Sequence, residues 1–198
     1  LGQVDYAQDR LDDAARRFAA NLQTAQAHCL FDEVVRAQIN IGLVCTMRGD
    51  FAAALQTMEA GWAAAQQSGD LLRETLALWN LGVACMRSSS LERARRCFGR
   101  ALTLASRLGH REYVRRILWN LLNLYLELGD DETVAYLYRR CQQMAEIDGT
   151  PRSRALLLYS QGDMALAQGQ PAMALAAFER SRMAFEEIGD GPRVHELH

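Results

Sequence analysis

The sequence predicts an all-α fold, a solenoid of about five antiparallel helix pairs that repeat every 40 residues. Three observations predict it. The same residue types recur at a spacing of 40 without an insertion, the chain has 30 alanines but only three prolines, and glycine-centred turns separate the apolar periodic segments. Alanine favours helix and proline interrupts it, so these segments are expected to be helical.

Three columns of residues carry the repeat. A glycine inside a helix costs about 1 kcal/mol relative to alanine, so a repeated glycine predicts close approach by a partner helix. We expect the small-residue column to face the glycines and the large-residue column to fill the gap beside them. The columns are Gly2, Gly42, Gly82, Leu122 and Gly162; Ala14, Ala54, Ala94, Val134 and Ala174; and Phe18, Met58, Phe98, Tyr138 and Phe178.

Each repeat is predicted to contain two helices. Gly49 and Gly129 supply the positive φ of a helix end, the aspartate after each can cap the next helix, and Pro151 and Pro171 fit a first helical turn. Residues 1–10 are expected to end a first helix. Further first helices are predicted near 31–48, 71–87, 111–128 and 151–168, and second helices near 11–28, 51–68, 91–108, 131–147 and 171–188.

The motifs on the first helices resemble the tetratricopeptide repeat family. They read N-I-G-x-x-C at 40–45, N-L-G-x-x-C at 80–85 and N-L-L-x-L-Y at 120–125. The period of 40 is similar to the variety in MalT-like bacterial regulators, kinesin light chains and Pins-type scaffolds. The resemblance implies a right-handed superhelical solenoid whose concave face binds a protein or peptide.

The resemblance covers essentially the whole chain, so we expect one tetratricopeptide-like domain over 1–198. Because the repeat phase is interrupted at both ends, we expect a fragment of a longer protein. The predicted repeats are 1–30 (partial), 31–70, 71–110, 111–150 and 151–190, followed by the start of a further helix.

The first helices carry a second, more polar stripe, which the resemblance assigns to the concave groove. Asparagine amides there can pair with a peptide backbone, aromatic rings add apolar surface with a polar edge, and arginines can take acidic groups. Alternatively, the rings pack between adjacent first helices and the asparagines bond the neighbouring helix. The candidate groove residues are Arg36, Asn40, Trp79, Asn80, Val83, Arg116, Trp119, Asn120, Asn123, Tyr159, Ser160 and Asp163.

Charge is concentrated in residues 91–116, which hold eight arginines against two glutamates. Four of these arginines share one helix face. That face is either a solvated outer surface or a docking stripe for an acidic partner. In the second case the partner is another protein or the acidic part of a second copy, which makes self-assembly the alternative function. The stripe consists of Arg93, Arg96, Arg100 and Arg107.

The favoured function is a protein- or peptide-binding scaffold, with the resemblance adding a bacterial regulator as its setting. The net charge of −2 gives no general attraction to nucleic acid, and no apolar run reaches the roughly 18 residues of a membrane span. No catalytic or phosphate-binding motif is present, so we expect neither enzyme activity nor a cofactor.

Cysteine and histidine give weak signals. The five scattered cysteines are typical of free thiols in the cytoplasm. A Cys and His hydrolase is a third hypothesis. His195 and His198 form an H-x-x-H pair, which we interpret as solvated histidines rather than metal ligands.

Overall fold

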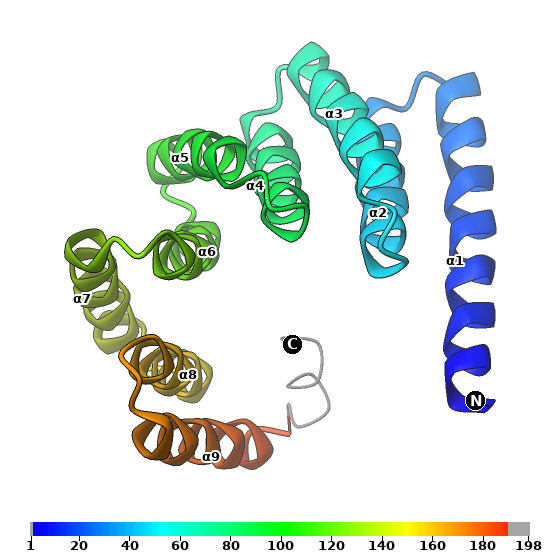
Figure 1. The fold of residues 1–198 in the computed structure, drawn as a ribbon. Coiled ribbons are helices and arrows are strands. Elements are labelled where there is room, and N and C mark those ends of the chain that lie inside the picture. The colour runs from blue at the N-terminus through cyan, green and yellow to red at the C-terminus, as the bar shows by residue number, and fades with distance from the viewer. Residues whose placement is uncertain (1, 190–198) are drawn as a thin grey trace. The chain divides into compact units, whose positions relative to one another are not determined.

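The computed structural model describes residues 2–189, and their side chains from Arg10 onward. This part of the chain is all-α, as predicted, and contains no strand. Its helices are α1 (Gly2–Ala27), α2 (Phe31–Met47), α3 (Phe51–Ser68), α4 (Leu71–Arg87), α5 (Leu91–Arg107), α6 (Arg111–Leu128), α7 (Asp131–Asp148), α8 (Pro151–Ala167) and α9 (Pro171–Glu187) (Figure 1). The predicted start of a further helix after 190 and the His195/His198 pair lie outside the described residues.

The helices α2 to α9 agree with the predicted segments to within one residue at each end. Aspartates cap the helix starts as expected. The Asp50 side chain accepts from the Ala53 N–H, and that of Asp130 accepts from the Thr133 N–H, a bond that lowers the pKa of Asp130. The glycines of the turns have positive φ, and Ser89 takes this conformation where the sequence lacks a glycine.

The prediction for the first 28 residues is wrong. The expected turn near residue 10 is absent, because α1 continues from Gly2 to Ala27 as one helix (Figure 1). Asp9 stands in the slot of Gly49 and Gly129, and Arg10 stands where Asp50 and Asp130 cap a helix. The chain therefore lacks both the residue that favours positive φ and the residue that caps a new helix, so the helix does not stop.

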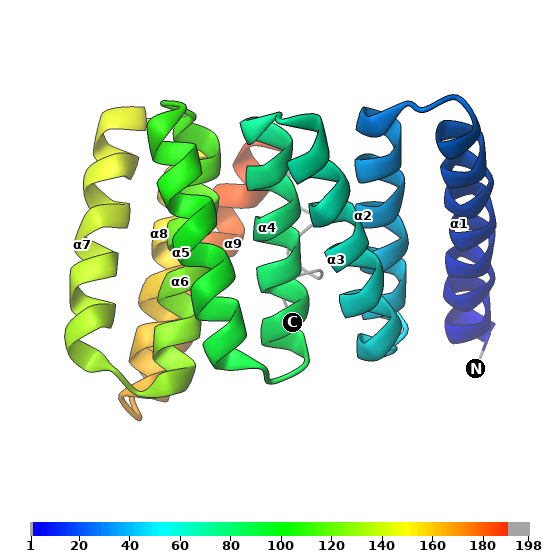
Figure 2. The ribbon, with the colours of Figure 1, turned by 90° about the horizontal axis from the view of Figure 1, so that it is seen from above.

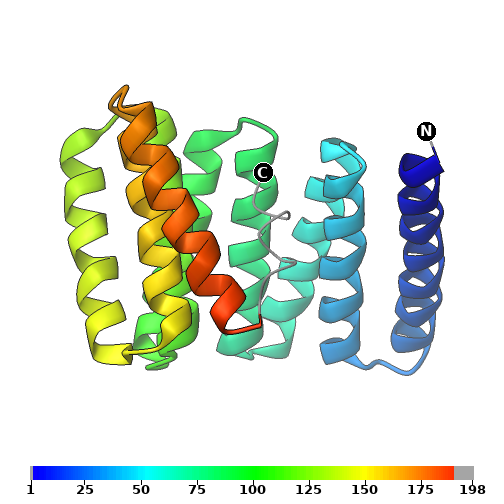
Figure 3. The same cartoon turned by 90° about the horizontal axis from the view of Figure 1, so that it is seen from below.

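The chain forms two compact units, unit 1 (Leu1–Ile117) and unit 2 (Leu118–His198). In unit 1, α2 packs on α3 and α4 on α5, while α3 and α2 also contact α4. Figure 2 shows α2 and α3 side by side and antiparallel. In unit 2, α8 packs between α7 and α9, and Figure 3 shows α9 inclined across α8. A single domain over 1–198 stays a prediction.

The glycine column receives the large-residue column as its nearest contact. At Gly42 the carbonyl oxygen of Ala54, in the small-residue column, also lies 3.4 Å from a placed Cβ. A Cβ placed on Gly82 would lie 2.5 Å from Cε1 of Phe98, a ring with no exposed surface. On Gly42 it would lie 2.6 Å from Cγ of Met58, and Gly162 is covered in the same way by Phe178. Each glycine therefore makes room for a side chain of the second helix in its own pair, and this contact sets the spacing of the pair.

The fourth repeat departs from this arrangement because Leu122 replaces the glycine. Leu122 is fully buried, whereas Tyr138, in the large-residue column, is only partly buried. The hydroxyl of Tyr138 instead accepts a 2.7 Å hydrogen bond from Nε2 of Gln161 on α8. The leucine fills the space that a ring occupies in the neighbouring repeats.

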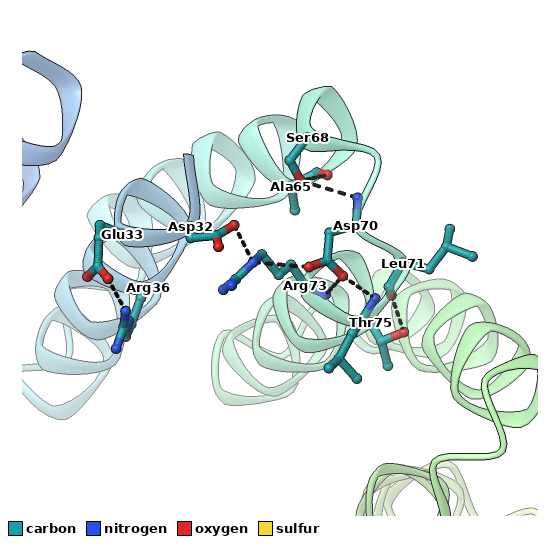
Figure 4. A network of polar contacts seen from close by, with 10 residues as sticks. Asp32, Glu33, Arg36, Ala65, Ser68, Asp70, Leu71, Arg73 and Thr75 are labelled. Atoms are coloured by element: carbon teal, nitrogen blue, oxygen red, sulfur yellow. Dashed lines mark hydrogen bonds and ion pairs between the residues drawn. The ribbon is translucent and has the colours of Figure 1, made fainter. Parts of the chain in front are cut away.

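Ion pairs add a second link between first helices in unit 1. Arg73 on α4 lies between Asp32 on α2 and Asp70, the N-cap of α4 (Figure 4). Its Nε is 3.2 Å from Oδ2 of Asp70. Separately, no described helix combines the length and apolar character required to span a membrane.

The glycine contact predicts opposite effects at two helical glycines of unit 1. Gly82→Ala should lower the free energy of unfolding by about 1–2 kcal/mol, because the methyl group displaces the packed Phe98 ring. Gly99→Ala, where no atom lies within 4 Å of the added Cβ, should raise it by about 1 kcal/mol through helix propensity. Urea unfolding of both variants checks this, and stabilisation by Gly82→Ala would contradict the proposed role of the contact.

Candidate functional site

The predicted groove residues fall into one group on each unit. Unit 1 holds Arg36 on α2, Asn40 on α2, Trp79, Asn80 and Val83 on α4, and Arg116 on α6. Unit 2 holds Trp119, Asn120 and Asn123 on α6, and Tyr159, Ser160 and Asp163 on α8.

In unit 1, an aromatic cluster joins α4 to the start of α6. The rings of Trp79 and Tyr113 are 5.9 Å apart, and His110 stacks on Tyr113 at 4.1 Å with an interplanar angle of 12°. The Arg116 guanidinium lies over the Trp79 ring at 5.5 Å and donates to Glu112. Burial alone would raise the pKa of Glu112, but the hydrogen bonds from Arg115 and Arg116 lower it.

Sequence reasoning missed Tyr113 and His110. The 40-residue columns align equivalent positions on successive helices, whereas Tyr113 meets Trp79 from a different column on the next first helix. Tyr113 was visible in the sequence as an aromatic residue one turn before Ile117 on the packing face. Its contact with Trp79 depends on how far apart the two helices lie.

The remaining groove candidates of unit 1 differ in exposure. Asn80 is only 9 % exposed, and its Nδ2 donates to the Leu76 carbonyl of its own helix at 2.8 Å. Arg36 is exposed and pairs with Glu33 one turn earlier (Figure 4). Asn40 and Val83 are partly exposed. In this unit, burial therefore withdraws Asn80 from a ligand but leaves the other candidates and the partly exposed aromatic cluster accessible.

In unit 2, two aromatic contacts hold α8 between α6 and α9. The Trp119 and Tyr159 rings are 5.6 Å apart, and the Tyr159 and Phe178 rings are 5.1 Å apart. Tyr159 is 7 % exposed, and burial, together with the charge of Asp163, raises the pKa of its phenol. Trp119 and Asn120 remain partly exposed, while Ser160 is fully buried.

One turn beyond this ring pair, two polar groups lack partners. Oδ1 of Asn123 is enclosed by protein, and among the described residues of unit 2 it is the enclosed side-chain polar atom without a hydrogen bond. Asp163 is half-buried and makes no hydrogen bond or ion pair within residues 10–189. Burial raises the pKa of Asp163 to about 6. Enclosed polar atoms are normally paired, which makes Oδ1 of Asn123 an exception, and the half-buried Asp163 carboxylate is the group that a ligand can reach.

The arginine stripe is largely used within unit 1. Arg93 pairs with Glu59 of α3. Arg100 donates to Oε1 of Glu74 at 2.6 Å and covers the Trp62 ring at 5.1 Å, while Nε1 of Trp62 donates to Glu74 at 3.4 Å. Because Glu74 is 8 % exposed, this cluster ties α3, α4 and α5 together around a buried carboxylate.

The other two stripe residues point to solvent. Arg96 lies 3.8 Å from Glu92, with both side chains mostly exposed. Arg107 has no hydrogen bond or ion pair among the described side chains. Docking of an acidic partner on the full stripe would therefore compete with the existing ion pairs of Arg93 and Arg100.

The cysteines of the described chain are all free thiols. Burial raises the pKa of Cys45 and brings that of Cys141 to about 11, which disfavours a nucleophilic thiolate at both. Cys85 and Cys97 are buried and share a hydrogen bond, which together with burial raises the pKa of Cys85. The same hydrogen bond lowers the pKa of Cys97 against the opposing effect of burial. Within the described residues, no group of three His, Cys, Asp or Glu side chains is placed to hold a metal ion.

Comparison with known families and structures finds a match over part of the chain and a similar fold. The tetratricopeptide repeat model matches residues 74–147. The crystal structure of BtubC (BKLC) from P. vanneervenii is similar to this chain, with a TM-score of 0.73 and 17 % identity over 96 % of this chain and 78 % of that chain. At this identity the likeness concerns the fold. The search of curated proteins found no match.

Two arginines of the stripe should respond differently to truncation. Arg100→Ala leaves the buried Glu74 carboxylate without its cation and should lower the free energy of unfolding by about 2 kcal/mol. Arg107→Ala removes an exposed side chain and should change it by less than about 0.5 kcal/mol. Denaturant unfolding of both variants measures the difference, and equal losses would argue against a structural role for the Glu74 cluster.

Asp163 should make stability depend on pH in a defined window. Its pKa is about 6 in the folded chain against an ordinary value of 3.8, so between these values the folded chain binds more protons than the unfolded chain. Lowering the pH through this window therefore raises the free energy of unfolding of the parent chain. It leaves that of the Asp163→Asn variant unaffected by this group. The variant should be the more stable protein near neutral pH, and its advantage should shrink toward about pH 4. A pH-independent difference in unfolding free energy would contradict the assignment.

Proposed function

Since residues 74–147 belong to the tetratricopeptide repeat family, whose repeats mediate protein–protein interaction, we propose that this chain is a scaffold that binds an extended peptide on its first helices. The surface we assign to the peptide in unit 2 is the partly exposed stripe of Trp119, Asn120, Asn123 and Asp163. In unit 1 it is the Trp79 aromatic cluster, which consists of Trp79, Tyr113, His110 and Arg116.

The observation that carries the proposal is the unpaired Oδ1 of Asn123. An enclosed carbonyl oxygen without a donor costs free energy, which a ligand N–H recovers once the partly exposed Asn123 side chain turns to meet it. An extended peptide presents N–H groups along its backbone, and a side-chain amide pairs with them independently of sequence. Beside Asn123, the partly exposed Trp119 offers the apolar surface with a polar edge that is typical of binding hot spots.

A wider setting extends this proposal. The resemblance to MalT-like regulators supports a role in the sensing part of a bacterial regulator, and the free thiols support a cytoplasmic location. Tetratricopeptide scaffolds are typically not enzymes, and the same proposal therefore includes a non-enzymatic role for this chain. Self-assembly through the arginine stripe is the second candidate, and the internal pairing of Arg93 and Arg100 places it behind peptide binding.

Selection of peptides from a random display library on the immobilised chain tests the proposal. For a selected peptide, Asn123→Ala should weaken binding about fivefold, the value of one hydrogen bond. Asn21→Ala, an exposed asparagine on α1, is the matched control and should leave the affinity unchanged. N-methylation of one backbone nitrogen of the peptide should reproduce the loss, and this effect should vanish in Asn123→Ala.

Two results would overturn the proposal. The first is a library that yields no peptide dependent on either surface, with both variants retaining the helical circular dichroism of the parent. The second is a selected peptide whose affinity Asn123→Ala and substitutions in the Trp79 aromatic cluster leave unchanged.

A further inference from the structure

Asp163 differs from the other enclosed carboxylates of the described chain. Glu74 and Glu112 are paired with arginines, and Asp70 binds the N-terminus of α4 as well as Arg73. Asp163 has lost much of its contact with water without gaining a hydrogen bond or a counter-ion. Desolvating a carboxylate is costly, so an unpaired one on a folded surface is a site that a cation can satisfy.

The chain does not supply that cation from the described part of unit 2. Six arginines lie between residues 118 and 189, and none pairs with Asp163. Arg140 lies over the Tyr136 ring, Arg182 pairs with Glu186, and Arg139 donates to the Ala135 carbonyl.

The register of α6 and α8 is expected to bring Asn123 near Asp163. The two helices run in the same direction, because α7 reverses the chain between them. Trp119 and Tyr159 are in contact at 5.6 Å, and a step of four residues along each helix leads to Asn123 and to Asp163. Tyr159 lies one helical turn before Asp163 on α8, and the charge of Asp163 contributes to the raised pKa of the Tyr159 phenol.

The unpaired atoms of this surface are hydrogen-bond acceptors. They are Oδ1 of Asn123 and the carboxylate oxygens of Asp163, next to two aromatic rings. Such a set is complementary to a group that carries positive charge and several N–H donors, and aromatic faces add a cation–π attraction. An acidic or purely accepting ligand group would be repelled by the same atoms.

We propose that unit 2 binds a basic side chain, arginine or lysine, of its peptide partner between the Trp119–Tyr159 ring pair and Asp163. The carboxylate of Asp163 accepts one N–H of this side chain. Oδ1 of Asn123 accepts a second N–H from the same residue after the partly exposed Asn123 side chain turns outward. This inference rests on the proposed peptide-binding function and adds the charge of the residue that the peptide presents to unit 2.

The tryptophan indole N–H signals of the isotopically labelled chain test this inference by nuclear magnetic resonance. The chain has three tryptophans, of which Trp119 reports on the proposed site while Trp62 and Trp79 lie in unit 1. The probes are blocked pentapeptides Ala-Ala-X-Ala-Ala, with arginine, citrulline or glutamate at X. Citrulline has the shape of arginine without its charge.

The arginine peptide should shift the Trp119 signal to saturation. It should bind about tenfold or more tightly than the citrulline peptide, because hydrogen bonds between charged groups are stronger than those between neutral groups. Asp163→Asn should abolish this preference. Asp131→Asn, which removes an exposed carboxylate on α7, is the matched control and should preserve it.

Equal binding of the arginine and citrulline peptides, or an arginine preference that survives Asp163→Asn, would overturn the inference and leave the proposed function standing. The same holds if only the glutamate peptide shifts Trp119. If none of the peptides moves the Trp119 signal of the folded chain, the inference also fails. The display selection then decides the proposed function separately, because it does not depend on the charge of any one residue.

Discussion

The contact between a glycine of one helix and a large side chain of the next underlies the arrangement of the helix pairs. Phe98 lies on Gly82, Phe178 on Gly162 and Met58 on Gly42. Each contact brings the two helices of a pair together at one position along their length, which fixes their relative register. Nearby positions of the first helices carry the aromatic and asparagine residues, and of these Tyr159 also contacts Phe178 of the partner helix.

Arginine supplies the second structural element of unit 1. The chain has no lysine, and several of its arginines connect helices: Arg73 joins α4 to α2, and Arg100 joins α5 to the buried Glu74 of α4. The planar guanidinium suits these positions because it can bond a carboxylate and lie over an aromatic ring at once, as Arg100 does with Glu74 and Trp62. Within the arginine stripe, Arg93 and Arg100 thus form ion pairs between helices, whereas Arg96 and Arg107 stay exposed.

In unit 2, some polar groups of the first helices lack a partner within the described chain. On the first-helix face of this unit, Oδ1 of Asn123 and the Asp163 carboxylate have no partner among the described residues, although arginines are available nearby in the sequence. Natural chains rarely leave such groups unsatisfied without a use for them. The free energy that this costs the isolated chain is the same quantity that a ligand would recover, which is why the face is our preferred site for the peptide.

The sequence by itself determined the helices and their pairing, since apolar periodicity, turn glycines and capping aspartates are local signals with a fixed spacing. It also selected Asn123 and Asp163, through their place in the stripe. It failed at α1, where Asp9 and Arg10 replace the residues that stop a helix and start another. Only the tertiary structure decided that Phe98 lies on Gly82, that Tyr113 meets Trp79, and that Arg100 is paired whereas Asp163 is not. These outcomes depend on the distance between side chains of different helices, which a one-dimensional pattern does not contain.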